Sequence, residues 1–121
     1  FKNIKIHLKL DTGMHRVGFE EKDIDELIQL LNFNSSLEVA SIFSHLAASD
    51  SVTHDNFTKQ QADTFVAACT LLEKNIPYPF IKHIANTSAI HRHKNLQFDM
   101  VRLGIGLYGV DGNEKMQQQL K

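Results

Sequence analysis

The feature that most constrains the fold is the alternation of strand-like and helix-like patterns along the 121 residues. Residues 3–11 carry apolar side chains at every second position, which is typical of a strand with one buried face. Apolar positions at helical spacing follow in 24–31 and again from about residue 59, and strand-like runs lie at about 39–46 and 80–85. Alternating strands and helices predict a parallel sheet with right-handed crossovers.

The ends of two elements carry further signals. Thr58 and Gln61 have the spacing of a capping box at the start of the second helix, and Pro77 and Pro79 follow its end. Residues 100–110 are apolar and interrupted by glycines, which predicts a fourth strand with its exit loop. The order is therefore that of four βα units.

The first strand has a polar face opposite its apolar one, formed by Lys5, His7, Lys9 and Asp11. Parallel sheets normally bury both faces, so this polar face needs a special environment. A barrel supplies one, because barrel enzymes place polar side chains near the C-terminal ends of their strands. We therefore predict an α/β fold in residues 1–110, a partial TIM (β/α)8 barrel, with 111–121 beginning a linker toward a second domain.

Charge and cysteine content exclude several classes of protein. Thirteen basic and fourteen acidic residues give a net charge of −1, so we expect no nucleic-acid partner. No apolar run approaches the roughly 20 residues that span a bilayer, so we expect no membrane. The single cysteine, Cys69, lies in an apolar helical pattern and is expected in the core of a cytoplasmic protein. The chain starts almost inside a strand, which suggests truncation.

The segment from His7 to Phe19 is the strongest chemical signal. It places Lys9, Asp11 and Arg16 within one strand and its loop. Such a cluster suits an anion held by Arg16, with the other two side chains setting the geometry of the guanidinium. A network of ion pairs at the strand end, without any ligand, explains the same residues equally well.

The other strand ends are ambiguous when each is taken alone. His45 ends the second strand and suits a satisfied structural histidine. Asn86 and Thr87 follow the third strand, where they suit either a helix N-cap or contacts to phosphate oxygens. Gly104 lets a backbone approach an anion closely, but a glycine-rich strand also packs tightly.

Together these strand ends resemble the alanine racemase family. The string His-Leu-Lys-Leu-Asp-Thr-Gly-Met-His-Arg-Val-Gly at residues 7–18 is similar to the one that follows the fifth strand of the family's barrel, with His15 in place of a glycine. The resemblance implies a fold type III barrel that binds pyridoxal 5'-phosphate (PLP), with strands five to eight in this chain. It also implies an N-carboxylated Lys9 bracing Arg16, which lies near the phenolic oxygen of the cofactor and the substrate carboxylate.

The resemblance extends to the other three strand ends, in the family's order. It implies that His45 hydrogen-bonds Arg102, and that Arg102 faces the pyridine nitrogen of PLP. It places the phosphate at Asn86 and Thr87 and at the backbone amides of Gly104 and Ile105, with Ser88 as an alternative if the register shifts by one. Arginine is a poor proton donor, so the pyridine ring stays neutral, which limits side reactions such as transamination. Catalytic roles are therefore expected for Arg16, Lys9, Arg102 and His45.

Both catalytic bases of the family are missing from the chain. One is a lysine within a Lys-Ala-Asp-x-Tyr-Gly string on the first strand, which does not occur here, and the other is a tyrosine from the second domain of a partner subunit. We therefore expect an inactive fragment of a bacterial, homodimeric alanine racemase that interconverts L- and D-alanine for cell-wall synthesis, and that needs the rest of its own chain. Two alternatives remain: a serine or broad-specificity racemase with PLP, and a non-catalytic module that binds PLP.

Two histidine-containing segments carry no predicted chemistry. His91, Arg92 and His93 resemble a short metal clip but have no third ligand nearby in sequence, so no metal site is predicted. His54 and Asp55 are expected in a solvated loop.

Overall fold

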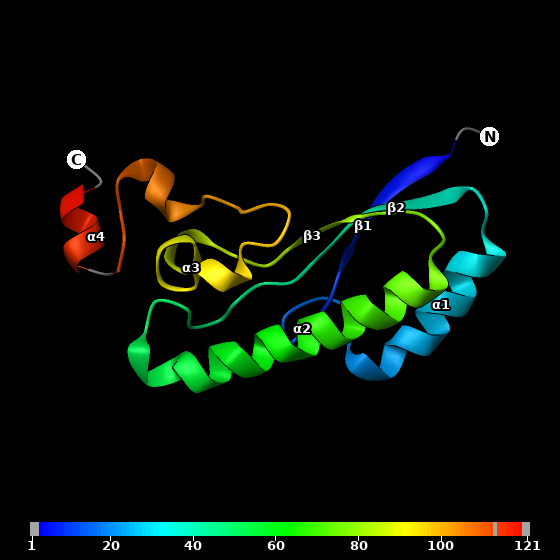
Figure 1. Ribbon diagram of the computed structural model, residues 1–121, viewed down its shortest axis with the longest axis horizontal. Helices are drawn as coiled ribbons and strands as arrows, with labels where there is room; N and C mark the ends of the chain where they lie inside the picture. The colour runs from blue at the N-terminus through cyan, green and yellow to red at the C-terminus, as the bar shows by residue number, and fades with distance from the viewer. Residues whose placement is uncertain (1–2, 113, 120–121) are drawn as a thin grey trace.

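The computed structural model describes residues 3–112 and 114–119. A parallel sheet is formed by β1 (Ile4–Lys9), β2 (Leu37–Phe43) and β3 (Ile81–His83), in that spatial order (Figure 1). Helix α1 (Ile24–Phe33) connects β1 to β2, and α2 (Asp55–Asn75) connects β2 to β3. The predicted alternation with parallel pairing is confirmed.

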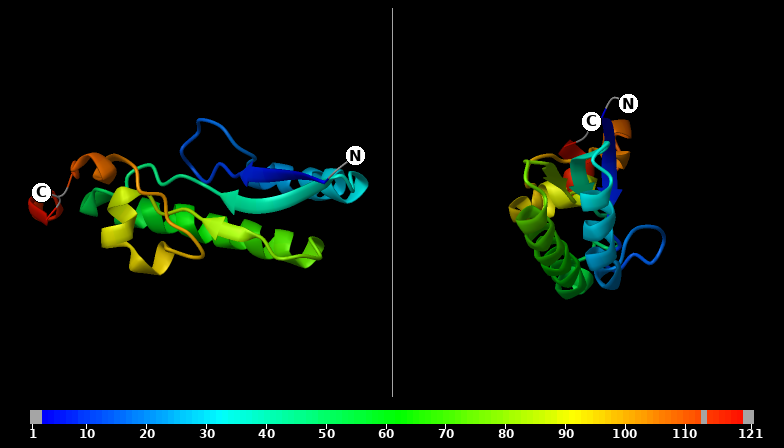
Figure 2. Two further views of the ribbon diagram at one scale, coloured as in Figure 1. Left: turned by 90° about the horizontal axis from the view of Figure 1, so that it is seen from above. Right: turned by 90° about the vertical axis from the view of Figure 1, so that its right-hand side faces the viewer.

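The two long helices lie on the same side of the sheet, as the end-on view in Figure 2 shows. Apolar side chains of the helices and strands meet between these layers, because each element keeps a continuous apolar face. The deeply buried members from the sheet and the helices are Leu8, Val39, Ile42, Ile24, Leu27, Leu31, Phe65, Cys69 and Leu72. The helical periodicity therefore predicted the core, including the position of Cys69.

The opposite side of the sheet is polar. His7, Ser41 and His83 come one from each strand, and both histidines hydrogen-bond the Ser41 hydroxyl on this side. A sheet with helices on one face and polar side chains on the other has the layering of a segment of barrel wall, in which the polar face borders the lumen. The structure is thus compatible with the predicted partial barrel.

The predicted fourth strand at residues 100–110 is corrected. Within the described ranges the sheet has three strands, and two backbone hydrogen bonds join residues 99–102 to the chain in and just after β3. Asp99 donates its N–H to Lys82 (3.1 Å) and Arg102 donates to Ala85 (3.0 Å), after which residues 105–108 form a 3₁₀ turn. A regular ladder therefore does not form in this segment.

The predicted capping box at Thr58 and Gln61 is wrong. Helix α2 begins at Asp55, so both residues lie inside it, where they are fully buried. The Gln61 amide accepts a hydrogen bond from the Ala47 N–H (2.9 Å) and donates one to the His45 carbonyl (3.1 Å). Its side chain therefore satisfies the backbone of the loop after β2, which is why it is not available for capping.

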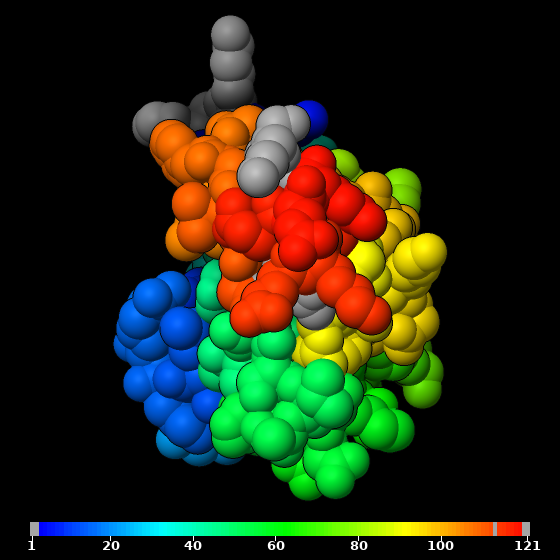
Figure 3. All heavy atoms as spheres, turned by 90° about the vertical axis from the view of Figure 1, so that its left-hand side faces the viewer, coloured from blue at the N-terminus to red at the C-terminus, as the bar shows by residue number. Residues whose placement is uncertain are grey.

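Two short helices complete the fold. Helix α3 (Thr87–Arg92) follows β3, and α4 (Glu114–Gln119) ends the described chain. The described residues leave out three places in the predicted ranges 1–110 and 111–121, namely residues 1–2, residue 113 and residues 120–121. Figure 3 looks onto the end of the molecule toward which the strands run, where α4 lies beside segment 100–110, above α3 and the start of α2.

Two kinds of feature are absent from the described residues. None of the helices described is long and apolar enough to cross a membrane. The same part of the chain contains no group of three or more histidine, cysteine, aspartate or glutamate side chains that could hold a metal ion.

Candidate functional site

The loop after β1 is closed by a single carboxylate. Asp11 accepts hydrogen bonds from the backbone N–H groups of Gly13 (3.0 Å), His15 (3.0 Å) and Arg16 (3.1 Å). Burial alone would raise the pKa of Asp11, but the hydrogen bonds from these three donors and the nearby His15 charge together lower it. Asp11 therefore stays ionised at neutral pH and determines the path of the loop.

Asp11 thus contacts Arg16 through the backbone, and the prediction that its side chain orients the guanidinium is corrected. The Arg16 side chain projects from an exposed residue, and no hydrogen bond of its guanidinium occurs in the described part of the chain. Lys9 is half-buried at the end of β1. His15, which occupies the expected glycine position, has a φ of 53°, so the backbone there keeps the left-handed conformation that glycine favours.

The Arg102 guanidinium lies across the ends of β2 and β3. Its Nη1 contacts Nδ1 of His83 and donates to the His83 carbonyl (3.3 Å), and its Nη2 donates to the Ser44 carbonyl. The guanidinium carbon is 5.1 Å from the centre of the Phe43 ring. Burial lowers the pKa of Arg102, but arginine remains protonated at neutral pH. The site therefore holds a partly buried, oriented cation.

The predicted hydrogen bond between His45 and Arg102 is corrected, because the histidine that contacts the guanidinium is His83. Both histidines follow or end neighbouring strands, so the sequence alone does not distinguish them. The same cations act on His45. Burial lowers its pKa, and the charges of Arg102, Arg16 and Lys9 lower it further. For His83, burial followed by the charges of Arg102 and His7 lowers the pKa to about 4.

The start of α3 is organised by two polar side chains. The Asn86 side-chain oxygen accepts from the Ala89 N–H (3.1 Å), which makes Asn86 the N-cap, and also from the Ser49 hydroxyl (2.8 Å). The Thr87 hydroxyl accepts from the N–H groups of Gly104 (3.0 Å) and Gly106 (3.2 Å). A hydroxyl has two lone pairs and one hydrogen, so Thr87 still has its own hydrogen to donate.

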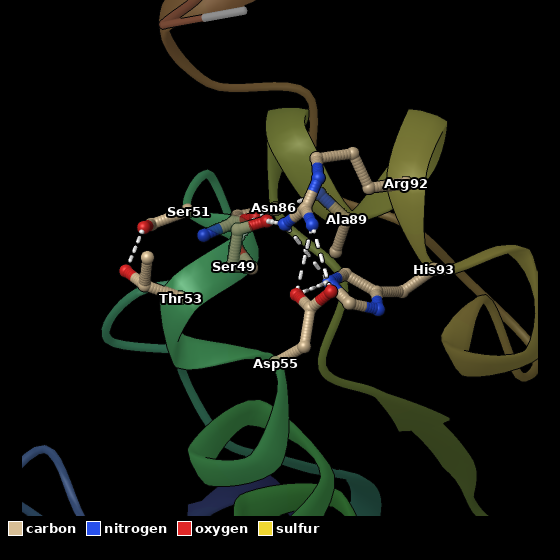
Figure 4. A network of polar contacts seen from close by, with 8 residues as sticks. All are labelled: Ser49, Ser51, Thr53, Asp55, Asn86, Ala89, Arg92 and His93. Carbon is tan, nitrogen blue, oxygen red and sulfur yellow. Dashed lines mark hydrogen bonds and ion pairs between the residues drawn. The ribbon is translucent and has the colours of Figure 1, made fainter.

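A second network behind this loop was missed by the sequence reasoning. Asp55 accepts two hydrogen bonds from Arg92 Nη2 (2.8 and 3.0 Å), and Arg92 Nη1 donates to the Ser49 carbonyl (Figure 4). His93 Nε2 lies 3.6 Å from Asp55 Oδ1. The expected solvated loop at His54 and Asp55 is therefore corrected, because Asp55 begins α2 and anchors α3. An arginine and a carboxylate were the only sequence signal for this ion pair, and Asp55 and Arg92 lie 37 residues apart, so no local pattern joined them.

These contacts define what the strand ends can do chemically. Three cations, Lys9, Arg16 and Arg102, lie close enough to His45 to lower its pKa, and the groups that act on His45 include no carboxylate. Thr87 contributes a hydroxyl hydrogen beside segment 100–110, which also carries Arg102. Such a set of donors suits a ligand with several acceptor atoms and negative charge. The fold is thus compatible with a segment of βα barrel, and the donors at its strand ends are of the kind that an anion needs.

Comparison with known proteins identifies the family. The profile of the family "Alanine racemase, N-terminal domain" matches residues 1–112, so the chain belongs to that family. The chain is 40% identical to the alanine racemase of Prochlorococcus marinus over 113 residues, which are 89% of this chain and 28% of that protein. It is 41% identical to the alanine racemase of Fusobacterium nucleatum over 116 residues, 93% of this chain and 31% of that protein.

Solved structures give the same result. The alanine racemase of a D-cycloserine-producing Streptomyces lavendulae superposes with a TM-score of 0.87 at 31% identity, covering 98% of this chain and 32% of that one. The enzyme from Corynebacterium glutamicum gives a TM-score of 0.85 at 28% identity, covering 94% and 32%. The chain thus spans less than a third of the length of these relatives.

Proposed function

We propose that this chain is the part of a bacterial, cytoplasmic alanine racemase that holds pyridoxal 5'-phosphate, and that its three strands belong to the second half of the barrel. The observation that carries the proposal is the oriented guanidinium of Arg102, which lies at the strand ends among further cations. Family membership supports the reaction, interconversion of L- and D-alanine for cell-wall synthesis by a homodimer.

The donor groups fit the parts of this cofactor. The phosphate, which carries the negative charge, is assigned to the hydroxyl hydrogen of Thr87 and the amide of Ile105, with Asn86 holding the turn. The Gly104 N–H points to Thr87 in the structure, so it reaches the phosphate only if it leaves that hydroxyl. Arg102 is assigned to the pyridine nitrogen, where a permanent cation donates a hydrogen bond without transferring its proton.

The remaining assignments concern the substrate side. When bound, the cofactor withdraws electrons from the substrate Cα and so makes its hydrogen acidic. Arg16 is assigned to the substrate carboxylate and the phenolic oxygen, with Lys9, as an N-carboxylysine, bracing the guanidinium. His45 lies beside this group of cations, where its lowered pKa keeps it neutral at pH 7. The bases that remove and return the Cα proton are assigned to parts of the protein outside this chain.

Cofactor binding tests the proposal directly. We expect the complete polypeptide that contains this chain to bind PLP, and Thr87→Val to weaken binding of PLP by about tenfold or more, because a hydrogen bond to a charged group is lost. Binding of pyridoxal, which lacks the phosphate, should change much less. Ser88→Ala is the matched control, and a larger effect of Ser88→Ala than of Thr87→Val would transfer the phosphate contact to Ser88.

The substrate decides between the remaining candidates. The complete polypeptide is offered alanine, serine and lysine, and the rate of racemisation of each is measured. Fastest turnover of alanine supports the proposal, whereas fastest turnover of serine or lysine would identify another racemase of this fold. Binding of PLP without racemisation of any of the three would indicate a binding module.

A further inference from the structure

The short helix α3 is hydrogen-bonded at both of its ends to one residue, Ser49, in the loop after β2 (Figure 4). At the start of the helix, the Ser49 hydroxyl donates to the side-chain oxygen of Asn86 (2.8 Å). At the other end, Nη1 of Arg92 donates to the Ser49 carbonyl. Ser49 is buried (2% exposed), so water does not compete for either contact. A helix held at two separate points cannot tilt without breaking a hydrogen bond, so Ser49 determines how α3 lies against this loop.

The contact at the start of the helix has a definite direction. The side-chain oxygen of Asn86 carries no hydrogen and already accepts from the Ala89 N–H (3.1 Å), so the Ser49 hydroxyl has to donate to it. The side-chain nitrogen of Asn86 donates to the Leu46 carbonyl (3.4 Å) in the same loop. Both ends of the Asn86 amide are therefore engaged, and the amide cannot turn over without losing these contacts.

The contact at the far end of the helix is held in place from α2. Nη2 of Arg92 donates to both carboxylate oxygens of Asp55 (2.8 and 3.0 Å), the first residue of α2. The Arg92 side chain is only 11% exposed, and a cation at such a depth needs its acceptors close by. The guanidinium is thus fixed by Asp55 while its Nη1 reaches Ser49, and the network joins α2, the loop after β2 and α3 (Figure 4).

Thr87 lies between the two points at which α3 is held. It is the first residue of the helix, and its buried hydroxyl accepts from the N–H groups of Gly104 and Gly106. We propose that Ser49 and Arg92 are positioning residues for the phosphate of the cofactor, because they fix both ends of α3 and thereby the place of the Thr87 hydroxyl. This inference rests on the proposed function, which assigns the phosphate to that hydroxyl.

The first test needs no cofactor. In the complete polypeptide without PLP, hydrogen exchange is followed at the amides of Gly104 and Gly106, whose hydrogen bonds to Thr87 depend on where α3 lies. We expect Ser49→Ala to speed exchange at both amides about fivefold, the size of one hydrogen bond. Ser51→Ala, which removes an exposed hydroxyl contact from the same loop, should leave both rates unchanged. Unchanged exchange in Ser49→Ala, or equal acceleration in the two variants, would overturn the proposal.

The second test separates positioning of the phosphate from a general loss of stability. In the complete polypeptide, we expect Ser49→Ala to weaken binding of PLP about fivefold and binding of pyridoxal less than about twofold, because only PLP carries the phosphate. The phosphorus-31 NMR shift of bound PLP should change in Ser49→Ala and stay the same in Ser51→Ala. Equal weakening of the two ligands, or an unchanged phosphorus shift in Ser49→Ala, would contradict positioning.

Arg92→Gln tests the other end of α3. We expect it to weaken binding of PLP more than binding of pyridoxal, and the double variant with Ser49→Ala to lose less than the product of the two single effects, because both act through the same helix. Effects that simply multiply would contradict a shared action, and if Arg92→Gln does not fold, the result of Ser49→Ala alone decides. Failure of the wild type to bind PLP would instead remove the proposed function, whereas exchange at Gly104 and Gly106 would still show whether the network fixes α3.

Discussion

Gly18 is the residue whose replacement the backbone tolerates least. Its φ is 138°, and a Cβ at this position would lie 2.7 Å from the backbone nitrogen of Asp11. We expect Gly18→Ala to lower the free energy of unfolding by about 1–3 kcal/mol through the backbone conformation alone, with the clash adding to this. Denaturant unfolding measures this loss of free energy. Gly112→Ala is the control, since its Cβ makes only ordinary contacts, and an equal loss there would contradict the explanation.

The lowered pKa of His83 predicts how stability depends on pH. Burial, and then the charges of Arg102 and His7, which face the ring from segment 100–110 and β1, lower the pKa to about 4. The unfolded chain therefore binds this proton first, and the contribution of neutral His83 is lost as the pH falls from about 6.5 toward 4. Denaturant unfolding at several pH values should show a shallower dependence in His83→Asn than in the wild type. His91→Asn, at an exposed position, should keep the wild-type slope, and identical slopes for all three would contradict this prediction.

Among the elements, α2 and α3 are joined by the ion pair of Asp55 and Arg92. The Arg92 side chain is 11% exposed and that of Asp55 is 44% exposed, so the pair is only partly screened by water. We expect Asp55→Asn to lower the free energy of unfolding by about 1–2 kcal/mol, since it leaves the guanidinium without its charged partner. Asp63→Asn breaks the exposed pair with Lys59 in the same helix and should cost less than about 0.5 kcal/mol. Equal losses for the two variants would mean that the Arg92 network does not join the helices.

Local patterns predicted the elements better than the contacts between them. The apolar spacing of α1 and α2 predicted both the helices and the side they bury, because periodicity follows directly from backbone geometry. The capping box failed because the spacing of Thr58 and Gln61 is that of a helix start, whereas both side chains are buried inside α2 and Gln61 hydrogen-bonds the loop after β2. The pairing of Asp55 with Arg92 joins residues far apart in sequence and left no local signal.

In the candidate site, too, the functional groups were predicted better than the contacts between them. The family resemblance implied that Arg102 is a key group at the strand ends, and the structure places its guanidinium there. It did not distinguish His45 from His83 as its partner, since both are strand-end histidines and the choice depends on how the side chains point in three dimensions. The resemblance to one family supplied the roles, whereas the geometry of the sheet supplied the partners.

For the whole molecule, the exposed apolar side chains of segment 100–110 are the feature most prone to cause association between chains. Leu103, Ile105, Leu107 and Tyr108 are between 53% and 82% exposed, and the segment that carries them is joined by a backbone hydrogen bond to Ala85, just after β3. We expect the purified 121-residue chain to associate as its concentration rises, and Leu103→Lys with Leu107→Lys to reduce this association. Sedimentation velocity at increasing concentrations measures this association. A wild-type chain that stays monomeric at high concentration would contradict the prediction.

We propose that this chain holds the cofactor and that the bases lie elsewhere in the protein. Exchange of the alanine α-hydrogen for deuterium in D2O tests it most directly, because exchange requires a base to act on Cα. With PLP present, we predict that the complete polypeptide exchanges and racemises alanine. The 121-residue chain should exchange it no faster than free PLP does. Exchange by the short chain well above that of free PLP, abolished by removal of one of its own side chains, would contradict the account.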